Sequence, residues 1–451
     1  MRHTRLTPGN YASFATVMLA TGLVGTGFGL VDLLMIAPKG VGHVAAVGQG
    51  SIVLLAVSTF FLGVVEAFSG RLAIAEGAGT TARRLPVLAT TLLLALALCQ
   101  LAALPAAALA EPALTLLGQK PELVPPMGDY LQVRLCGIGV IMLYTALNEA
   151  LKTCGAKNRS LATLLLGFGV NALLNWAFLY TGLAGLFPSP DSAVAASTVL
   201  AQAAMAAMAG WMFLRLLRTR AERLARPGRA EVLTELRTTT LAGAGVGARH
   251  LNDYMGSLIP MTLIGTMGVG TLAASVVAAN IYTVFCRVPQ ACFQATFVYY
   301  GYAVGRDGAA RPGTVRTLLG YAAVPTAAAA LLVVAASPWL VDAFASPGLD
   351  HGLAVALLMA YLLYLPAYFF DQSLSTILIV HRRGGLLFAS STLATYLLTI
   401  PLAWYAVVVL DSAFLAVASN GVATVVQAAL FWRALRAVRT LPPARAEAGV
   451  A

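Results

Sequence analysis

The sequence predicts an all-α integral membrane protein with about 12 transmembrane helices in two pseudo-symmetric six-helix lobes. Three observations predict this fold class: a strongly apolar composition, long uninterrupted apolar segments, and a glycine motif that recurs half a chain length later. Apolar residues make up 59% of the 451 residues and charged residues only 10%. Soluble domains carry roughly 25% charged residues, so the composition excludes a soluble globular protein.

Long apolar segments run through the whole chain. A helix that crosses a bilayer needs about 20 mostly apolar residues. Because the apolar residues are continuous and do not alternate with polar ones, the segments indicate helices and not barrel strands. We expect spanning helices near 14–37, 44–68, 86–110, 129–151, 160–182, 192–215, 239–265, 271–302, 316–341, 352–380, 385–410 and 412–434.

Basic residues gather in alternate loops between these segments. With the N-terminus placed in the cytoplasm, all Lys and Arg residues but five fall on that side, 29 − 5 = 24. Cytoplasmic loops carry such an excess, so the net charge of +11 indicates topology and not a nucleic-acid partner. We expect a multi-pass protein of the cytoplasmic (inner) membrane, with both termini cytoplasmic and the lipid bilayer as its partner.

The chain offers no sign of a resident metal, a cofactor or an enzyme. The five cysteines lie mostly inside apolar segments, and no pair has the spacing of a metal site or a disulfide framework. No nucleophile–base pair is predicted at membrane depth. We therefore expect no enzymatic activity and no cofactor, with H⁺ or Na⁺ as a coupling ion.

A short motif is repeated half a chain length apart. The stretch "GVGHVAAV" begins at Gly40 and "GVGTLAAS" begins at Gly268, a separation of 268 − 40 = 228 positions. Both halves start inside and hold an even number of helices, so they are parallel repeats. An alternating-access transporter needs such repetition.

The longest polar stretch, "RLLRTRAERLARPGRAEVLTELR", separates the two copies of the motif. It predicts an N-lobe at 1–214, a cytoplasmic basic linker at 215–238, and a C-lobe with a cytoplasmic tail at 239–451.

Three carboxylates lie inside predicted helices: Asp32, Asp253 and Asp371. A charge at the bilayer centre costs at least about 2.5–3.5 kcal/mol on insertion scales, so such residues usually face a cavity and are functional. We expect all three to bind the coupling cation, including a possible Na⁺ at Asp253 and Asp371.

Tyrosines precede one of these acids at helical spacing. Tyr361, Tyr364, Tyr368 and Asp371 are 3, 4 and 3 positions apart, which places them on one face of a straight helix. Such a face suits a cationic or aromatic substrate through cation–π contact. The alternative is a packed aromatic seam with one polar residue.

Two arginines lie close to the acids in the C-terminal half. Arg249 precedes Asp253 by four residues and so shares its helix face, where the two could pair. Arg287, which precedes Pro289, either pairs with Asp253 or Asp371, which we favour, or receives an anionic substrate group in the cavity.

Asn171 and Asn175 are one helical turn apart in the N-terminal half. They either line the substrate cavity or bridge helices.

Taken in order, several stretches resemble the multidrug and toxic compound extrusion (MATE) family of the MOP flippase superfamily, closest to its NorM-like branch. They include "GLVDLLMIAPKGVGHVAAVG", "LTLLGQKPEL", "NALLNWAFLY", "LIGTMGVGTLAASVVAANI" and "RVPQACFQA", within roughly 14–437. The resemblance implies a coupling acid at Asp32, acids at Asp371 and at Asp253, where the NorM-like branch has Glu, and cavity residues at Asn171, Asn175 and Thr198.

The sequence also departs from the family. Ile74 and Tyr302 stand where a Gln is common, and neither Arg287 nor the spacing of Arg249 and Asp253 is expected. These departures put a free Na⁺ in the C-lobe in doubt and leave room for an acidic or zwitterionic substrate.

The sequence and the resemblance together predict a secondary active efflux transporter. It would export small organic molecules, such as drugs or toxic or natural-product metabolites, by H⁺ or Na⁺ antiport and alternating access, acting as a monomer. The alternative is a flippase for lipid-linked saccharides or other lipids, with Arg134, Arg249 and Arg287 as its only support.

Overall fold

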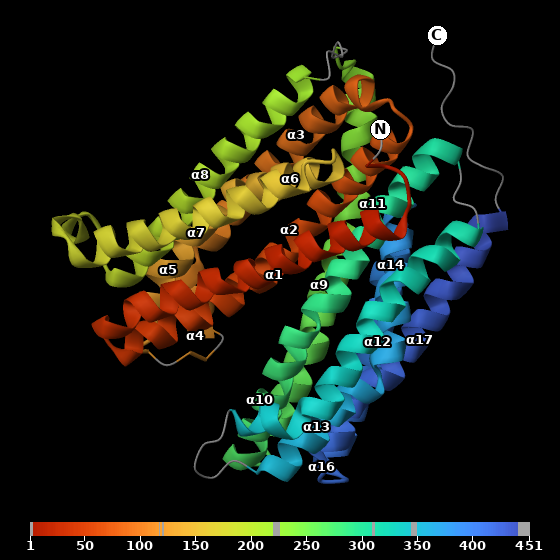
Figure 1. Ribbon diagram of the computed structural model, residues 1–451. Helices are drawn as coiled ribbons and strands as arrows, with labels where there is room; N and C mark the ends of the chain where they lie inside the picture. Colours follow the sequence, from red (N-terminus) through yellow and green to blue (C-terminus); the bar gives the residue numbers. More distant parts are fainter. Residues whose placement is uncertain are drawn as a thin grey trace. The chain divides into compact units, whose positions relative to one another are not determined.

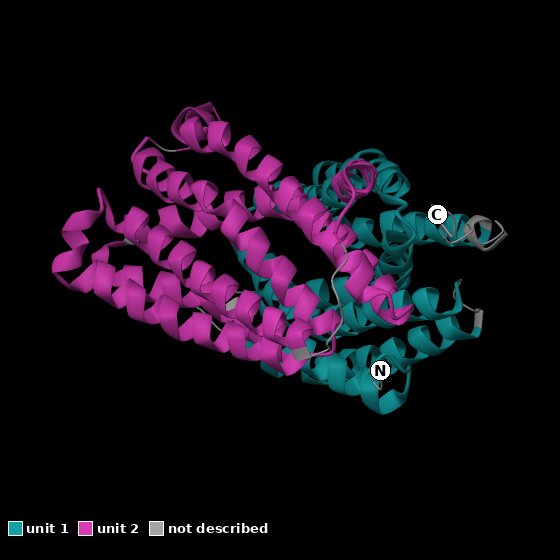
Figure 2. Cartoon of the chain, turned by 90° about the horizontal axis from the view of Figure 1, so that it is seen from above, with its two compact units in different colours: residues 1–19, 245–451 teal, residues 20–244 magenta. Residues whose placement is uncertain are grey.

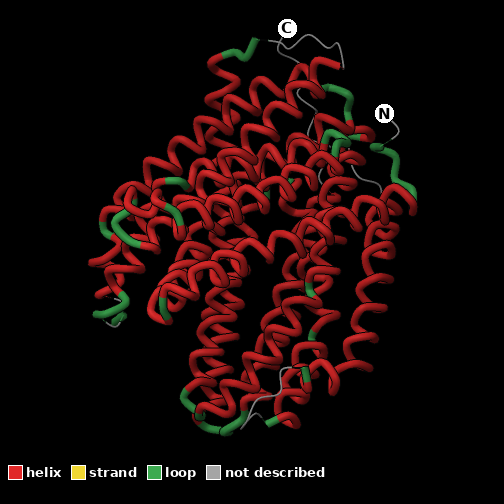
Figure 3. The backbone as a smooth tube through the Cα atoms, turned by 60° about the vertical axis from the view of Figure 1, so that its left-hand side comes forward, coloured by secondary structure: helices red, strands yellow, loops and turns green. Residues whose placement is uncertain are grey.

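The computed structural model describes residues 3–116, 118–119, 121–219, 226–308, 312–343 and 350–440. Regular structure in these ranges is helical and contains no strand (Figure 3). The all-α prediction is therefore confirmed. Residues 220–225 of the predicted linker and 441–451 of the predicted tail lie outside the described ranges.

The helices follow one another with short connections (Figure 1). The first half contains α1 (Pro8–Ile36), η1 (Ala37–Lys39), α2 (Val41–Gly77), α3 (Thr81–Ala108), α4 (Ala110–Leu116), α5 (Val124–Cys136), α6 (Ile138–Thr153), α7 (Lys157–Tyr180), η2 (Gly182–Leu186) and α8 (Pro190–Thr219). The second half contains α9 (Arg229–Gly265), α10 (Val269–Phe285), α11 (Arg287–Asp307), α12 (Pro312–Asp342), α13 (His351–Leu363), α14 (Leu365–Val380), α15 (Gly384–Thr392), the π-helix η3 (Leu393–Thr399), α16 (Ile400–Val408) and α17 (Ala413–Thr440).

Each predicted spanning segment coincides with a helix or a series of helices. Among the described residues, nine helices are long and apolar enough to cross a membrane, or up to 11 if each of two bent pairs is one span. The predicted segment 239–265 is helical but does not qualify, because residues such as Arg249 and Asp253 lower its hydropathy. If each bent pair counts as one span, the described residues contain 11 apolar spans, and α9 brings the number of long helices to 11 + 1 = 12. The predicted number of about 12 agrees with the long helices and is one higher than the number of apolar spans.

Two of the predicted segments are bent. The pair α5 and α6 changes direction by 50° around Gly137, and the pair α13 and α14 by 42° around Tyr364. In the second pair Pro366 is the second residue of α14, and proline removes an amide donor and clashes with the carbonyl four residues earlier. The segment 352–380 is therefore not the straight helix we expected. The two bends are 364 − 137 = 227 positions apart.

The repeated glycine motif has the same backbone conformation in both copies. Gly40, the N-cap of α2, has φ 134° and ψ 155°, and Gly268, the N-cap of α10, has φ 126° and ψ 162°. This region of backbone space is essentially restricted to glycine because it has no Cβ. The motif therefore recurs because both helices start with a turn that only glycine forms without strain.

Other left-handed residues also occur in pairs at nearly this separation. Gly79 and Gly308 have φ 70° and 74° and are 308 − 79 = 229 positions apart. Gly155 and Arg382 have φ 84° and 58° and are 382 − 155 = 227 positions apart. The turns and bends of the chain thus repeat at one offset, which supports two pseudo-symmetric halves.

The chain divides into two compact units (Figure 2). Unit 1 contains residues 1–19 and 245–451, and unit 2 contains residues 20–244. Both boundaries fall inside helices, in α1 and α9, whereas the sequence boundaries placed all of α1 in the N-lobe and ended that lobe at residue 214.

Unit 2 is organised around α8, which packs along α5, α6 and α7, while α2 packs along α3, α5 and α6. Its core contains Leu72, Leu114, Met127 and Leu151. At Gly167 a Cβ atom would lie 2.0 Å from the Met205 sulfur, so glycine permits a close approach of α7 to α8. This contact is one helical turn from Asn171 and positions α7 for the site described below.

In unit 1, α14 packs along α11 and α17, and α10 packs along α13. Its core is rich in alanine, with Ala274, Ala278, Ala354, Ala360 and Ala403 all fully buried. Small side chains at helix contacts let the backbones approach closely, as is typical of helix packing in membranes.

The helix α9 begins in unit 2 and ends in unit 1. Its first turns are held in unit 2 by two ion pairs, Arg71–Glu235 at 3.2 Å and Arg84–Glu231 at 2.8 Å. Gly245 begins the part that belongs to unit 1, and a Cβ there would meet the backbone of Gly384. The predicted linker is thus helical at both ends, since residues 215–219 end α8 and residues 229–238 begin α9.

The glycine N-caps generate a prediction for stability. Replacing Gly40 or Gly268 with Ala forces a Cβ into a backbone region that costs about 1–3 kcal/mol. We expect Gly40→Ala and Gly268→Ala to lower the thermal unfolding temperature of the detergent-purified protein, and the two decreases to be similar to each other. Gly169→Ala is the control, because Gly169 lies within α7 and a Cβ atom there would have no neighbour within 4 Å. If Gly169→Ala destabilises as much as Gly268→Ala, the conformational explanation is wrong.

His381 generates a prediction for pH dependence. It follows α14, outside the apolar spans, and its Nε2 lies 2.7 Å from the Tyr300 hydroxyl. Burial first, and then the positive charge of Arg383, lowers the pKa of His381 below its ordinary value of 6.5. As the pH falls below 6.5, His381 takes up a proton more readily in the unfolded chain, so the folded protein should lose stability.

His381→Gln keeps a hydrogen-bonding group beside Tyr300 but cannot titrate. Unfolding temperatures measured between pH 7.5 and 5 should therefore fall less steeply for His381→Gln than for wild type. Equal slopes for the two proteins would exclude His381 as the titrating group.

Candidate functional site

Asp32 is the centre of a buried polar network in unit 2. It lies in the last third of α1, and only 4% of the residue is exposed. Its Oδ1 accepts a hydrogen bond from Asn175 Nδ2 at 2.8 Å, and its Oδ2 accepts one from Thr198 Oγ1 at 2.9 Å. The donors come from α7 and α8, so three helices converge on one carboxylate.

Asn171 closes the network into a ring. Its Nδ2 donates to Thr198 Oγ1 at 3.2 Å, and its Oδ1 accepts from Asn175 Nδ2 at 3.5 Å. All four N-lobe residues that the sequence predicted, Asp32, Asn171, Asn175 and Thr198, are therefore together. Ser197 also belongs to the network, because its hydroxyl donates to Asn175 Oδ1. We missed Ser197, although its position beside Thr198 in "AASTVLAQ" was a signal.

The hydroxyl of Thr198 has a second acceptor. The carbonyl oxygen of Val194 lies 3.0 Å from Thr198 Oγ1, one turn earlier on α8. If Asp32 carries a proton, the Thr198 hydroxyl turns to Val194 and its oxygen accepts from Asp32, since a hydroxyl oxygen has two lone pairs. The ring thus accommodates both protonation states of Asp32 without a movement of the heavy atoms.

Asp32 has only neutral hydrogen-bond donors. Within the described ranges, no basic side chain lies within ion-pair distance of its carboxylate, and its two donors are an amide and a hydroxyl. Arg134, which is also buried, donates instead to Gln202 Oε1 at 3.2 Å. A buried carboxylate without a cation is costly unless it binds one, so this site is suited to an exchangeable H⁺ or metal cation.

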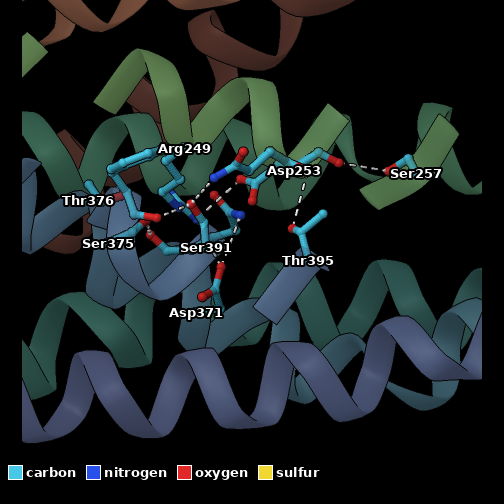
Figure 4. A network of polar contacts seen from close by, with 11 residues as sticks. Arg249, Asp253, Ser257, Asp371, Ser375, Thr376, Ser391 and Thr395 are labelled. Atoms are coloured by element: carbon cyan, nitrogen blue, oxygen red, sulfur yellow. Dashed lines mark hydrogen bonds and ion pairs between the residues drawn. The ribbon is translucent and has the colours of Figure 1, made fainter. Parts of the chain in front are cut away.

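Asp371 in unit 1 has a different environment (Figure 4). Its Oδ2 accepts from Arg249 Nη2 at 2.9 Å, and Arg249 and Asp371 are 1% and 3% exposed. The same Nη2 lies 3.6 Å from Asp253 Oδ2 on the next turn of α9. Arg249 is thus shared between the two predicted C-lobe acids and occupies the place between them where we had expected a free cation.

Residues around Arg249 complete this second network. Its guanidinium carbon lies 5.6 Å from the ring centroid of Phe431 on α17, which helps to fix its orientation. Asn252 Nδ2 donates to Ser391 and Thr392 at 2.9 Å, next to the π-helix η3. Asp371 Oδ1 is buried and accepts no hydrogen bond from the described residues.

Arg287 does not pair with either acid. It is the first residue of α11, and only Cys286, which has helical dihedrals, separates it from α10, so the two helices form one apolar span. Pro289 lies at the start of α11 and cannot donate a hydrogen bond to the carbonyl of Phe285. Arg287 Nη1 donates to Gln290 Oε1 at 3.2 Å, and it forms no ion pair with any described carboxylate. The pairing that we favoured from the sequence is therefore wrong.

The predicted tyrosines form an aromatic cluster with one addition, Tyr282 on α10. Its ring stacks on Tyr361 at 4.7 Å between centroids, and it lies 6.2 Å from Tyr364. Tyr368 is further along, 6.2 Å from Phe293. The bend at Tyr364 divides the three tyrosines between α13 and α14. The Tyr282 hydroxyl is buried and has no hydrogen-bond partner among the described residues, so it remains available to a polar ligand group.

The described residues contain no group of three or more His, Cys, Asp or Glu side chains that could hold a metal ion. The two carboxylates near Arg249 do not make such a group either. A metal ion at Asp32 would rely on one carboxylate and neutral oxygens.

Comparisons with known proteins agree on one family. The MatE family model matches residues 18–177, a region that contains Asp32, Asn171 and Asn175. The multidrug resistance protein NorM of Burkholderia vietnamiensis is 27% identical over 61% of this chain and 59% of its own length. A probable NorM of Bradyrhizobium diazoefficiens is 27% identical over 86% of this chain and 85% of its own. The match thus spans about three fifths of the Burkholderia relative.

Solved structures share the fold. A crystal structure of a MATE protein in a bent conformation has a TM-score of 0.81 with 19% identity, covering 97% of this chain and 98% of that chain. A MOP superfamily transporter from Pyrococcus furiosus, described as having a binding pocket of reverse polarity, has a TM-score of 0.74 with 20% identity, covering 98% of both chains. At this identity the likeness concerns the fold alone.

The buried ion pair in unit 1 generates a prediction. Removing one partner of a buried pair costs roughly 3–5 kcal/mol, because the other charge is left uncompensated. We expect Arg249→Gln and Asp371→Asn each to destabilise strongly, and the double variant to be less destabilised than the sum of the two. Unfolding in detergent, followed by circular dichroism, measures the cycle.

Arg287→Gln is the matched control for this cycle. It removes an arginine that donates only to Gln290, so it should cost far less than Arg249→Gln. Additive effects of Arg249→Gln and Asp371→Asn would show that the two charges do not stabilise one another.

Proposed function

Because the chain belongs to the MATE family, with NorM-type proteins among its relatives, we propose that it exports small organic molecules across the cytoplasmic membrane by cation-driven antiport. The two lobes would expose the substrate site to alternate sides of the membrane. Both termini would lie in the cytoplasm, as the distribution of basic residues favours. The names of the relatives support multidrug efflux, and the environment of Asp32 supports the coupling mechanism.

Asp32 is the residue to which we assign ion coupling. It is buried, its hydrogen-bond donors are neutral, and its ring of partners tolerates either protonation state. A proton entering from outside would neutralise Asp32 and change which lobe arrangement is preferred. Coupling requires only that ion and substrate bind the two states with different affinities. The membrane potential adds about 2.3 kcal/mol per charge per 100 mV.

Asp371 is assigned a lesser part in coupling. The Arg249 guanidinium already lies 2.9 Å from the Asp371 carboxylate, so an entering cation would have to compete with this side chain for Asp371. This contact argues against the free Na⁺ at Asp253 and Asp371 that the resemblance suggested. We propose that H⁺ exchanges at Asp32, while Arg249 holds the acids of unit 1 in a fixed charge state.

The aromatic cluster supports a substrate with a planar or cationic part. Tyr282 and Tyr361 form a stacked pair, Tyr364 is tilted against both, and the Tyr282 hydroxyl makes no hydrogen bond to the described residues. Ring faces attract cations and planar groups.

A lipid-linked saccharide flippase receives less support. It would need a wide cationic cavity, whereas Arg134 and Arg249 are buried and bonded to Gln202 and Asp371. We therefore retain it only as the outcome of a failed antiport test.

Transport in inside-out vesicles tests the proposal. A fluorescent cationic dye serves as substrate, under an imposed pH gradient and then an imposed Na⁺ gradient. We expect the pH gradient to drive dye uptake by wild type. Asp32→Asn should abolish this uptake, because an amide cannot bind and release a proton. Thr198→Val should reduce it, because the hydroxyl that alternates between Asp32 and Val194 is lost.

Asp411→Asn is the matched control. Asp411 is exposed, and its φ of 47° is tolerated by Asn, so the same chemical change should leave transport intact. If Asp32→Asn transports like wild type while Asp371→Asn is inactive, coupling resides in unit 1 and our assignment is wrong. If neither gradient drives uptake and both variants match wild type, the antiport proposal fails.

A further inference from the structure

All five tryptophans of the chain are solvent-exposed in the structure. Trp176, Trp339 and Trp404 lie within four residues of the last residue of their apolar span, with 50% or more of each residue exposed. Trp211 and Trp432 lie eight residues before the ends of α8 and α17, with 58% and 39% exposed. Tryptophans near helix ends are typical of the boundary between lipid tails and headgroups.

The two tryptophans of α8 and α17 belong to a repeated motif. The stretch "WMFLRLLRT" runs from Trp211 to Thr219, and "WRALRAVRT" runs from Trp432 to Thr440. Trp, Arg four positions later, Arg seven positions later and Thr eight positions later are common to both. Their separation is the same at each end, 432 − 211 = 221 and 440 − 219 = 221.

The first arginine of each motif lies against its tryptophan. The guanidinium carbon of Arg215 is 5.5 Å from the ring centroid of Trp211, and that of Arg436 is 5.2 Å from Trp432. Residues four apart share a helix face, so the ring and the guanidinium form one continuous surface. Each guanidinium is thereby held over the indole ring one helical turn earlier, in the last turns of the apolar span.

Three arginines of the two motifs lack a counter-charge among the described residues. Arg215, Arg218 and Arg436 are exposed, and among the described residues no carboxylate lies within 4 Å of them. By contrast, Arg71 and Arg84 are paired with Glu235 and Glu231 at the start of α9. The charge of the motif is therefore available to an external anion.

We propose that each Trp–Arg–Arg motif binds the phosphate headgroup of an anionic phospholipid. The indole would lie at the level of the glycerol backbone, and the guanidinium groups would bind the phosphate through charge-assisted hydrogen bonds. Exposed apolar side chains beside the motif, such as Leu214 at 56%, favour a lipid over a soluble anion. Clusters of basic residues at the cytoplasmic end of membrane helices bind anionic headgroups in this way. Each unit would carry one such site, independently of the substrate and of the coupling ion.

Lipid titration of the purified full-length protein tests the proposal. Native mass spectrometry in detergent counts retained phosphatidylglycerol molecules, with phosphatidylcholine as the neutral comparison. We expect wild type to retain two phosphatidylglycerol molecules with a clear preference over phosphatidylcholine. Arg215→Gln and Arg436→Gln should each remove one of them, with binding at that site about fivefold weaker per arginine lost. Trp211→Leu and Trp432→Leu should also weaken retention.

The double variant Arg237→Gln/Arg433→Gln is the matched control. It removes the same charge from exposed arginines, and Arg433 is next to Trp432 in sequence but on another helix face. If this control loses as much phosphatidylglycerol as Arg215→Gln/Arg436→Gln, net charge explains retention and the proposal is overturned. Equal retention of both lipids would overturn it too, as would displacement of phosphatidylglycerol by an equal concentration of inorganic phosphate. Circular dichroism and gel filtration confirm that each variant is folded, and none of these readouts depends on transport.

Discussion

The negative charge of a carboxylate inside a helical membrane bundle must be compensated by hydrogen bonds or by a positive charge. The two units of this structure do so in different ways. Asp32 receives hydrogen bonds from an amide and a hydroxyl, which stabilise its charge without cancelling it. Asp371 receives a guanidinium, which cancels the charge within the protein. The first arrangement leaves a site for an exchangeable cation, and the second fills it. The donors to Asp32 come from α7 and α8, which approach each other closely at Gly167. The guanidinium that binds Asp371 belongs to Arg249, which lies between Asp371 and Asp253.

The division of the chain into two halves shows what a repeat preserves. Glycine N-caps, left-handed turns, helix bends and the Trp–Arg motif recur at separations between 221 and 229 residues. These features either set the backbone conformation between helices or lie near the predicted membrane boundary, and both halves of the chain need them in the same places. The two buried carboxylates, in contrast, do not recur. The position equivalent to Asp32 is 32 + 228 = 260, a proline, and the one equivalent to Asp371 is 371 − 227 = 144, a tyrosine.

Much of this could be predicted from the sequence, because continuous apolar segments and glycine motifs report local constraints. All twelve segments are helical, and the four N-lobe residues expected at one site lie within hydrogen-bond distance of one another. What the sequence did not predict depends on contacts between distant segments. Helical spacing correctly indicated that Arg249 can pair with Asp253, but the closer partner, Asp371, is 122 positions away and could not be found from spacing. The partner of Arg287 was also wrong: its guanidinium donates to Gln290, three residues later on the same helix, and not to a distant acid.

The asymmetry of the buried charges bears directly on how an exporter of this kind would work. If both units carried an uncompensated acid, two cations would have to bind and leave in each cycle. Arg249 compensates Asp371 at 2.9 Å, with Asp253 at 3.6 Å as a second acid, and in the mechanism we propose only Asp32 changes its protonation state. In that mechanism one proton is exchanged per cycle, and the membrane potential contributes about 2.3 kcal/mol per 100 mV for each net charge that the exchange moves. In the mechanism we propose, the tyrosines of unit 1 would contact substrate without competing for the coupling ion. Ion coupling and substrate contact would then lie in different halves of a duplicated fold.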